Sequence, residues 1–516
     1  MIQLYKNKNT IKFKKAGANN MDVEKLYPEK VFHYFREISK IPRGSKKEKE
    51  ISDWLVKFAK GRGLQVMQDQ NYNVVIKKKA SEGYKDFSPL ILQGHMDMVW
   101  EKNKDTKFNF ETQGIELVEK EGFLKANGTT LGADNGIAVA YALAILDSDD
   151  IKHPALEILI TTDEEEGMSG AENLDYSVFD GKTLINLDTE EYGEIYVSSA
   201  GGGRTTTQFI LSPKKIKTED STLISIEIKG LSGGHSGAEI HKNFGNSNKI
   251  MGEVLYHLSK RYSMRLIHID GGEKVNAIPR EAMVHLNVKL DGDTVKEFEK
   301  AAKLAFGNIL KDFKAVDKSP IIEVSEISIE KLGKKPAEIS QSDTANIISY
   351  LHEFPNGIQA MSKQVEGLVE TSINLGVAKT ASVGGNIQMT FKALSRSSVS
   401  ASLQNLISEI TDLARKHGAN IKVDSAHLPW EYKEHSEIRD LIVKSFKKLT
   451  GKDAEIKAIH AGLECGIFTN KMENLDVVSI GPNIYGAHTP EERMDIKSVG
   501  DTWKLLLKIL EDYNIK

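Results

Sequence analysis

The sequence predicts an α/β fold in which a mostly parallel sheet, covered by helices, is interrupted by an inserted α+β domain. From about residue 21 to residue 200, apolar strand-like runs alternate with helical stretches, which is the pattern of a parallel sheet with helical crossovers. After the glycine-rich stretch at 198–209 the pattern changes to two-period strands and amphipathic helices. From about residue 405 it returns to α/β texture, as expected when one domain is inserted into another.

The first α/β part contains a regular series of predicted elements. Its longest apolar run, residues 137–146, is far too short to span a bilayer and is better interpreted as a core helix. The series reads, in chain order, VFHYFREI, EISDWLVKFAKGRG, NVVIKK, PLILQG, GIAVAYALAILD, ALEILITT and KTLINL.

The inserted part begins with the strand TLISIEIKGL and contains the amphipathic helices DTVKEFEKAAKLAFGNILKDF and SVSASLQNLISEITDLARKHG. Two segments, NAIPREAMVHLNVKL and TSINLGVAKTASVGGNIQMTFKAL, each predict two strands followed by one of these helices, which suggests an internal duplication. The closing α/β part contains SEIRDLIVKSFKKLTG, DVVSIGPN and SVGDTWKLLLKILEDY. We therefore predict a main domain over residues 21–203 and 403–516 and an inserted domain over 204–402.

Length and composition indicate a multidomain protein without unusual partners. At 516 residues the chain is too long for one compact core, and its net charge of −4 gives no reason to expect a nucleic acid or an acidic membrane as partner. The single cysteine, Cys465, excludes a disulfide within the chain and suits a reducing compartment, so a cytoplasmic location is expected. Residues 1–20 lack the apolar segment of a secretory signal and are predicted to be a disordered tail.

A cluster of acids follows one of the predicted strands. The stretch LITTDEEEGMSG, at 159–170, runs from an apolar strand directly into one aspartate and three glutamates. Like charges crowded at the end of a buried strand repel one another, so the arrangement is unfavourable unless solvent, protons or cations compensate. A solvated charged loop is the commoner explanation of such a run, and the alternative is a cation bound among the acids.

Polar residues that could bind a metal ion occur at five places just past apolar runs. Alone, each has a structural explanation: a strand-end histidine is usually a hydrogen-bonded core or loop residue, and an aspartate before a helix is usually an N-cap. In open α/β sheets, however, ligands bind beyond the carboxyl ends of the strands, where these residues would meet. The set comprises His95 with Asp97, Asp134, the acids at 163–166, Asp188 and His488.

Two histidines and several carboxylates form the inventory of a hydrolytic metal centre. Because the set contains no thiolate, it suits zinc, manganese or cobalt better than an iron–sulfur cluster or copper(I). Asp97 follows His95 by two residues on the same face of an extended segment, so it could accept the other ring N–H of His95 and orient the ring. We therefore prefer a metal site to five independent structural coincidences.

A series of motifs along the chain, GHMDMV, GTTLGADNG, TDEEEGMSGA, NLDTEEYGEIYVSSAGG, GGHSGAEI, HAGLECG and YGAHTPEER, resembles the metallopeptidase family M20. The resemblance is greatest to the aminoacyl-histidine dipeptidases of that family, also called Xaa-His or carnosinase-like dipeptidases, and runs from about residue 25 to the C-terminus. It implies that the main domain is a catalytic domain of the zinc-peptidase type. The inserted domain would be a lid that closes over a small peptide substrate.

The resemblance also implies two divalent metal ions, most often zinc, with manganese or cobalt as alternatives. Glu164 would be the general base. Asp163 and Glu166 would then have no role in the chemistry and are expected to be solvated. The implied metal ligands are Asp134 as the bridge, His95 and Asp188 on one ion, and Glu165 and His488 on the other.

Residues of the predicted lid and its surroundings match further family positions. His235 would polarise the scissile carbonyl, and the long lid implies that it acts within its own chain, although a homodimer is a possible assembly. Asn276 would hold the carbonyl oxygen, and the guanidinium of Arg396 would bind the C-terminal carboxylate of the substrate. His460 and Glu464 would line or support the pocket. As bare sequence features, Asn276 would be a turn residue and Arg396 a surface charge.

The predicted function is therefore metal-dependent hydrolysis of dipeptides, Xaa-His dipeptides in particular, by a metal-activated water. Other M20 amidohydrolases, namely tripeptidases, aminoacylases and carboxypeptidases, share the metal motifs. A protein that binds peptides without cleaving them is the alternative from another class, and the complete set of ligands argues against it. Cys465 as a nucleophile beside His460 is also disfavoured, because a thiolate mechanism does not need the metal set.

Overall fold

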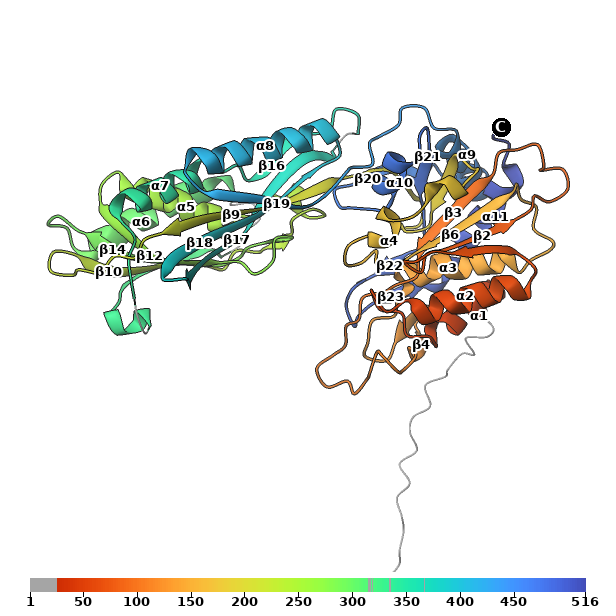
Figure 1. The fold of residues 1–516 in the computed structure, drawn as a ribbon, viewed down its shortest axis with the longest axis horizontal. Helices are drawn as coiled ribbons and strands as arrows, with labels where there is room; N and C mark the ends of the chain where they lie inside the picture. Colours follow the sequence, from red (N-terminus) through yellow and green to blue (C-terminus); the bar gives the residue numbers. More distant parts are fainter. Residues whose placement is uncertain (1–25, 314–316, 318, 334–335, 366) are drawn as a thin grey trace, which may run out of the picture. The chain divides into compact units, whose positions relative to one another are not determined.

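The computed structural model describes residues 26–313, 317, 319–333, 336–365 and 367–516, which form two compact units (Figure 1). The first unit comprises the described residues up to Ile195 together with Ser436–Glu455 and Leu475–Lys516. The second comprises Tyr196–His435 and Ile456–Asn474. The predicted tail, residues 1–20, lies outside the described residues. In the described part of the chain, no helix is long and apolar enough to cross a membrane.

An eight-stranded sheet with a parallel centre organises the first unit. Its strand order is β1-β2-β6-β3-β7-β21-β8-β20, and the chain passes into the second unit within β8 and near the start of β20. Strand β3 runs parallel to β6 and β7, and β7 runs parallel to β21, whereas β2 is antiparallel to β1 and β6. The predicted α/β fold with a mostly parallel sheet is confirmed. The strands are β1 Gln65–Gln68, β2 Val74–Lys78, β3 Leu90–His95, β6 Leu156–Thr161, β7 Thr183–Asn186, β8 Glu194–Ser199, β20 Glu455–Ile459 and β21 Asp476–Ser479.

The central strands and helix α3 form the core of this unit. Strands β3, β6 and β7 are buried along their whole length, as expected for parallel strands covered on both faces. The predicted core helix at 137–146 lies in α3 and is buried throughout. Helix α3 approaches β3 so closely that a Cβ atom on Gly94 would lie 2.5 Å from Asn135 Oδ1. The helices are α1 Glu29–Ser39, α2 Lys49–Gly61, α3 Ala133–Leu146, α4 Ser169–Glu172, α9 Glu437–Thr450 and α11 Ile496–Asp512.

A smaller antiparallel sheet of four strands, in the order β22-β23-β5-β4, joins distant parts of the first unit. Strands β22 and β23 flank the loop that carries His488, and β23 pairs with β5 from the N-terminal part of the chain. Strand pairing on both sides therefore anchors the loop that carries His488. The strands are β4 Leu117–Lys120, β5 Phe123–Ala126, β22 Ile484–Tyr485 and β23 Arg493–Asp495.

The second unit contains a nine-stranded sheet, and helices α5 to α8 lie on one of its faces (Figure 1). The order is β15-β10-β14-β12-β17-β18-β9-β19, and β16 pairs with β17. The elements are β9 Gly201–Leu211, β10 Thr222–Lys229, β11 Gly234–His235, α5 Ser247–Ser259, β12 Ser263–Gly271, β13 Ala277–Ile278, β14 Ala282–Lys289, α6 Val295–Ile309, β15 Ile321–Glu326, α7 Gln341–Glu353, β16 Gly357–Met361, β17 Val369–Val383, β18 Asn386–Ser397, α8 Ser400–Lys416, β19 Asn420–His427 and α10 Cys465–Lys471.

The two halves of this sheet have the same strand order. In chain order, one half consists of β10, β12, β14 and β15, and the other of β9, β17, β18 and β19. Counted outward from the β12–β17 contact, each half presents its second, third, first and fourth strand. Each inner strand pair also carries a register shift, between Leu266 and His268 in one half and between Leu375 and Val377 in the other. This correspondence supports the internal duplication suggested by the sequence.

The predicted domain ranges and the two compact units differ at both ends of the inserted domain, because the second unit begins at Tyr196 rather than at 204. The predicted lid, 204–402, stops before most of α8 and before β19, whereas the second unit extends to His435 and includes Ile456–Asn474. Strand β19 pairs with β9 over most of its length, so it belongs to the nine-stranded sheet. Sequence texture alone does not reveal this pairing, because β19 and β9 are separated by most of the inserted domain.

Candidate functional site

The predicted metal ligands all lie at the carboxyl ends of strands or at a helix start in the first unit. His95 is the last residue of β3, and Asp134 begins α3. Glu165 lies in the turn after β6, Asp188 follows β7, and His488 follows β22. His488 adopts a left-handed backbone conformation with φ 64°, which is uncommon for residues other than glycine and often marks a functional site.

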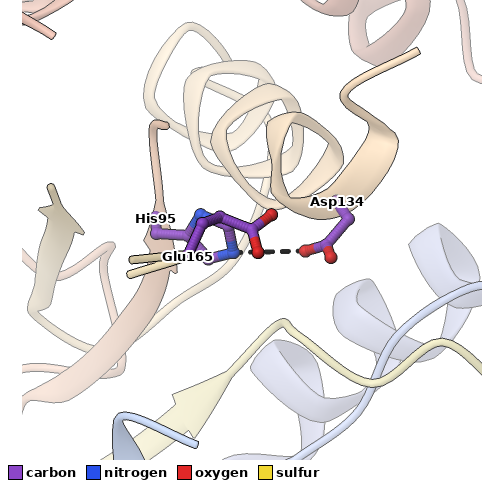
Figure 2. A group of neighbouring side chains, drawn as sticks. All are labelled: His95, Asp134 and Glu165. Carbon is purple, nitrogen blue, oxygen red and sulfur yellow. Dashed lines mark hydrogen bonds and ion pairs between the residues drawn. The ribbon is translucent and has the colours of Figure 1, made fainter. Parts of the chain in front are cut away.

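Asp134 lies between the two histidines. Its Oδ1 is 3.1 Å from His95 Nε2, and its Oδ2 is 3.1 Å from His488 Nε2. Asp188 Oδ1 lies 3.5 Å from His95 Nε2, and Glu165 Oε2 lies 2.8 Å from His488 Nε2. The side chains therefore form two groups, each with one histidine and one carboxylate, on either side of Asp134. Figure 2 shows His95 and Glu165 pointing toward Asp134, and donor atoms of these three residues lie within 4.8 Å of one another.

The electrostatics of this cluster fit divalent cations. Burial and then the nearby Asp134 raise the pKa of Glu165 to about 7, and Glu165 Oε1 is buried without a hydrogen-bond partner among the described residues. Hydrogen bonds to Asp134 and Glu165 raise the pKa of His488 to about 11. A cation among these groups would neutralise the carboxylates, supply the partner that Glu165 Oε1 lacks and leave both imidazoles neutral. The histidine and carboxylate donors therefore fit the metal ions that the sequence predicts.

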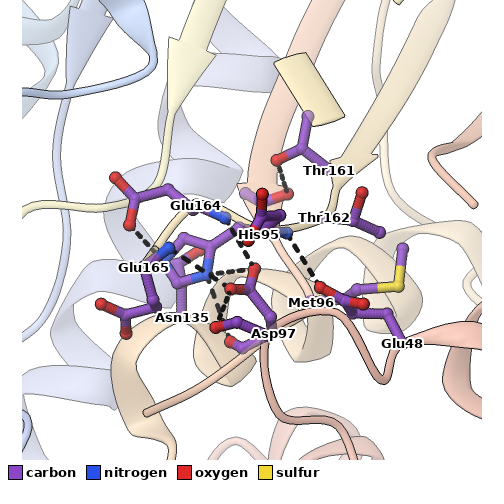
Figure 3. Close-up of polar contacts among 12 residues, drawn as sticks. Glu48, His95, Met96, Asp97, Asn135, Thr161, Thr162, Glu164 and Glu165 are labelled. Atoms are coloured by element: carbon purple, nitrogen blue, oxygen red, sulfur yellow. Dashed lines mark hydrogen bonds and ion pairs between the residues drawn. The ribbon is translucent and has the colours of Figure 1, made fainter. Parts of the chain in front are cut away.

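Asp97 supports both His95 and the acidic turn. It is fully buried, and its Oδ1 lies 3.4 Å from His95 Nδ1, as expected for a carboxylate that orients a metal-binding histidine. The same carboxylate accepts a hydrogen bond from the Ser45 hydroxyl at 2.8 Å. It also accepts hydrogen bonds from the backbone N–H groups of Glu164 and Glu165, at 3.1 and 3.3 Å (Figure 3). Asp97 thus fixes the backbone from which both glutamates project. Glu164 Oε2 lies 4.0 Å from His95 Nε2, at the edge of the cluster.

The other two acids of the run behave differently from each other. Glu166 is exposed and forms an ion pair with Lys46 at 2.5 Å, so its predicted solvation is confirmed. The prediction for Asp163 was wrong, because this residue is only 5% exposed. Its carboxylate accepts a hydrogen bond from the Ser169 hydroxyl, and its backbone carbonyl accepts one from Gly167 N–H. Asp163 is therefore a structural residue that closes the turn.

Two supporting residues were not recognised in the sequence. The carboxylate of Glu492, 2% exposed, accepts hydrogen bonds from four consecutive backbone N–H groups, those of residues 131–134, at 2.7 to 3.3 Å. Asn135 donates to Asp188 Oδ1 at 2.5 Å and to the Leu187 carbonyl at 2.8 Å. Glu492 follows His488 in the motif YGAHTPEER, but only the fold shows that its side chain reaches the start of α3.

The predicted substrate-binding residues lie in the second unit, where the structure brings four of them together. His235 pairs with Ala277 in the β11–β13 ladder, and Ser236 N–H donates to the Asn276 carbonyl at 2.9 Å. A Cβ atom on Gly237 would lie 3.0 Å from Arg396 Nε and 2.4 Å from the His460 carbonyl oxygen. The loop with His235 therefore contacts the surroundings of Asn276, Arg396 and His460. Glu464 is fully buried at the start of α10.

Arg396 is a buried cation rather than the surface charge that its bare sequence context suggests. It is 8% exposed, its Nε has no hydrogen-bond partner, and no acid lies within ion-pair distance among the described residues. Burial, and then repulsion from Arg204, lowers its pKa to about 10. Nearby His460 is held neutral, since burial and then Arg396 lower its pKa to about 3. An anion that reached this guanidinium would gain a strong charge-assisted hydrogen bond.

Cys465, the alternative nucleophile, has no exposed surface. A reactive thiolate needs access to its substrate, so burial argues against this alternative.

Comparison with known proteins identifies a peptidase family, in agreement with the predicted metal site. Residues 91–512 match the family described as Peptidase family M20/M25/M40. The chain is 35% identical to the cytosol non-specific dipeptidase of Escherichia coli (strain K12) over 495 residues, which cover 96% of this chain and all of that protein.

Solved structures give the same result. The aminoacylhistidine dipeptidase of Vibrio alginolyticus superposes with a TM-score of 0.87 at 33% identity, over 96% of this chain and 99% of that chain. A tripeptidase of Staphylococcus aureus has a TM-score of 0.57 at 17% identity, over 94% of this chain and 98% of that chain, and so shares the fold. The predicted family and the fold, with its main and inserted domains, are confirmed.

We expect Glu492→Gln to weaken metal binding by about 10- to 100-fold, because the amide NH₂ would face backbone N–H groups and release the segment that presents Asp134. Calorimetric titration of metal-stripped protein with zinc or manganese would measure the affinity. The matched control is Glu491→Gln, which changes the neighbouring exposed glutamate and should leave the affinity unchanged. Wild-type affinity in Glu492→Gln would contradict the supporting role.

Proposed function

Because the chain belongs to peptidase family M20/M25/M40, we propose that it is a metal-dependent dipeptidase that cleaves dipeptides, Xaa-His dipeptides among them. The observation that carries this proposal is the position of Asp134 between the His95 and His488 groups. Two relatives support the proposal. One, 35% identical, is named a non-specific dipeptidase, and the other, 33% identical, is named an aminoacylhistidine dipeptidase. The breadth of the first name argues that histidine is one accepted residue at the second position.

We infer that two divalent ions, zinc or alternatively manganese or cobalt, bind on either side of Asp134. Such ions lower the pKa of a water that they hold and so supply hydroxide near neutral pH. The chain provides three ligands for each ion, which leaves room for water and substrate. The proposed ligands are His95, Asp188 and Asp134 for one ion and Glu165, His488 and Asp134 for the other.

The proposed general base is Glu164. It would accept a proton from the attacking water and pass it to the amine that leaves when the peptide bond breaks. Asp97 supports this role because it holds the backbone N–H of Glu164 and the ring of His95 with the same carboxylate. A base that shares its anchor with a metal ligand keeps a fixed position relative to the water.

His235 and Asn276 are proposed to hydrogen-bond the carbonyl oxygen of the scissile peptide as it gains negative charge. His235 Nδ1 accepts hydrogen bonds from the backbone N–H groups of Gly237 and Ala238, at 3.2 and 2.9 Å. The proton of the neutral ring therefore resides on Nε2, which is the tautomer that can donate to an oxyanion.

Arg396 is proposed to bind the C-terminal carboxylate of the substrate. A desolvated guanidinium without an acidic partner is unfavourable in the free protein, and a substrate carboxylate would relieve this. Anchoring the free carboxylate limits the length of peptide beyond the cleaved bond, which favours dipeptides over longer substrates. Neutral His460 and buried Glu464 would complete the pocket wall.

The inserted domain is proposed to be a duplicated lid, so that one chain carries both halves. The His235 loop follows β10 in one half, whereas Arg396 lies on β18 in the other. His235 would then act within its own chain, and catalysis would not require a second copy of the protein. A homodimer remains a separate prediction about assembly. A cytosolic location is also proposed, in line with the name of the E. coli relative and with the single, buried cysteine.

The first experiment is a substrate panel of β-Ala-His, Ala-His, Leu-Gly, Gly-Gly-Gly and an N-acetyl amino acid, tested with metal-stripped protein before and after adding zinc, manganese or cobalt. We expect no cleavage without metal and cleavage of the dipeptides with it. Cleavage of the tripeptide or the acylated substrate alone would replace the dipeptidase by another activity of the family. Binding of dipeptides without turnover under every condition would favour a peptide-binding protein.

Glu164→Ala should lower kcat by at least about 100-fold while leaving metal affinity close to that of the wild type, because the proton acceptor is lost but the ligands remain. Steady-state kinetics and metal titration would be compared in the same preparation. Glu166→Ala is the matched control, since this exposed neighbour should not affect turnover. Retained turnover in Glu164→Ala, or loss of its metals, would refute the assignment.

Arg396→Lys should raise KM for Ala-His by about 10- to 100-fold, because lysine keeps the charge but loses the paired donors of the guanidinium. The dipeptide amide, which lacks the carboxylate, should bind poorly to the wild type and be affected little by the substitution. Arg265→Lys changes a half-exposed arginine of the same sheet and should leave both KM values unchanged. An equal rise in KM for the dipeptide and its amide would exclude Arg396 as the carboxylate anchor.

A further inference from the structure

A buried asparagine in one half of the lid holds the segment of the other half that carries Asn276. Asn374 lies on β17 and is 1% exposed. Its Nδ2 donates hydrogen bonds to the carbonyl oxygens of Val275 and Ala277, both at 2.9 Å. The side-chain amide therefore uses both of its N–H groups on the two carbonyls that flank Asn276 in sequence.

The carbonyl group of Asn276 itself is also held. Val275 and Asn276 form a turn, in which Ala277 N–H donates a hydrogen bond to the Lys274 carbonyl at 3.3 Å. The Asn276 carbonyl accepts a hydrogen bond from Ser236 N–H at 2.9 Å, and Ala277 pairs with His235 in the β11–β13 ladder. With the carbonyl groups of residues 275, 276 and 277 all hydrogen-bonded, the backbone at Asn276 is fixed, and the His235 loop is tied to the same segment.

Asn374 is itself fixed by a network of amides. Its Oδ1 accepts a hydrogen bond from Asn246 Nδ2 at 2.9 Å, and Asn246 also donates to Asn356 Oδ1 at 3.1 Å. Asn246 is the N-cap of α5, where its Oδ1 accepts from Lys249 N–H at 3.1 Å. These contacts determine which end of the Asn374 amide carries the nitrogen. They prevent its rotation away from the segment.

The backbone of β17 lies directly against the same segment. A Cβ atom on Gly376 would lie 2.6 Å from Val275 Cα, and one on Gly272, whose φ is +71°, would lie 1.9 Å from the Gly376 carbonyl oxygen. Side chains are therefore excluded from this contact. Asn374 supplies the hydrogen bonds across it.

We propose that Asn374 is a positioning residue, which sets the segment 275–277 so that Asn276 and His235 meet the peptide carbonyl in the geometry of reaction. This inference rests on the proposed function, because it assumes that Asn276 and His235 act on the substrate. Asn374 itself does not touch the substrate. Its effect on catalysis comes entirely from the backbone that it holds.

The test compares Asn374→Ala with Asn248→Ala in the metal-loaded, full-length protein. The two asparagines are closely matched, since Asn248 is also fully buried and its Nδ2 donates to two backbone carbonyls, those of Gly271 and Leu375, at 3.2 and 3.1 Å. Neither of these carbonyls flanks Asn276. We expect similar losses of thermal stability in both variants, and a loss of kcat of about 100-fold in Asn374→Ala alone. Metal affinity should be unchanged in both.

A double-substitution cycle separates positioning from general damage. In an Asn276→Ala background, Asn374→Ala should lower kcat by less than about 10-fold, because one of the two side chains that it positions is already gone and only the effect through His235 remains. Equal kcat losses in Asn374→Ala and Asn248→Ala, or full additivity with Asn276→Ala, would overturn the inference. Should Asn374→Ala fail to fold, Asn374→Ser, which keeps one donor, should show an intermediate loss of kcat, and wild-type kcat there would also overturn it.

Failure of the proposed function has a different signature. If Asn276→Ala and His235→Ala both retain wild-type kcat, the assignment of these residues to the carbonyl oxygen is wrong, and Asn374 has nothing to position. If they are inactive while Asn374→Ala keeps its activity, only the role of Asn374 is refuted.

Discussion

The rest of the structure depends on the repulsion among carboxylates collected at one edge of the parallel sheet. The side chains of Asp134, Glu165 and Asp188 are 14%, 4% and 6% exposed, so solvent screens their charges poorly. Two histidines offset this repulsion only in part, since burial and the nearby Asp134 raise the pKa of Glu165 to about 7, and burial raises the pKa of Asp188 as well. Divalent cations would turn the repulsion into attraction. The fold must therefore hold the cluster together by interactions that do not involve the cluster itself.

Two kinds of buried carboxylate can be distinguished around the cluster. Asp97 and Glu492 accept several hydrogen bonds from backbone N–H groups. These bonds offset the desolvation cost of the buried carboxylates and fix the loops before α3 and after β6. Glu165, by contrast, keeps one buried oxygen without a partner among the described residues. The backbone N–H groups that Asp97 and Glu492 bind thus distinguish these two supporting acids from Glu165. An unpaired oxygen alone does not mark a ligand, since Oδ1 of the structural Asp163 also lacks a hydrogen-bond partner among the described residues. The supporting acids are as necessary to the site as the proposed ligands, because the supporting acids position the ligands.

This division also explains how far the sequence predicts the site. His95 and Asp188 were predictable because they end or follow apolar runs, and the carboxyl ends of neighbouring parallel strands meet in any α/β sheet. Asp134 was predictable because it precedes the apolar run of a core helix. The burial of Asp163 was predicted wrongly, and the role of Glu492 was missed, since both depend on which backbone groups a loop turns toward. Local sequence patterns do not predict such contacts between distant segments. For the same reason the α/β alternation was visible in the sequence, whereas the pairing of β19 with β9 was not.

The two halves of the second unit, which we propose to be a duplication, carry different proposed roles. One half carries His235 and Asn276, which are proposed to act on the carbonyl oxygen, and the other carries Arg396, which is proposed to hold the carboxylate. Asn374 links the two, because it lies on the strand next to that of Arg396 and bonds the segment of Asn276. In this arrangement the distance between the groups proposed to hold the peptide carbonyl and the C-terminal carboxylate would be set by covalent and hydrogen-bonded connections within a single sheet. A symmetric assembly of separate chains would have to fix that distance through an interface instead, with the ordering entropy that association requires.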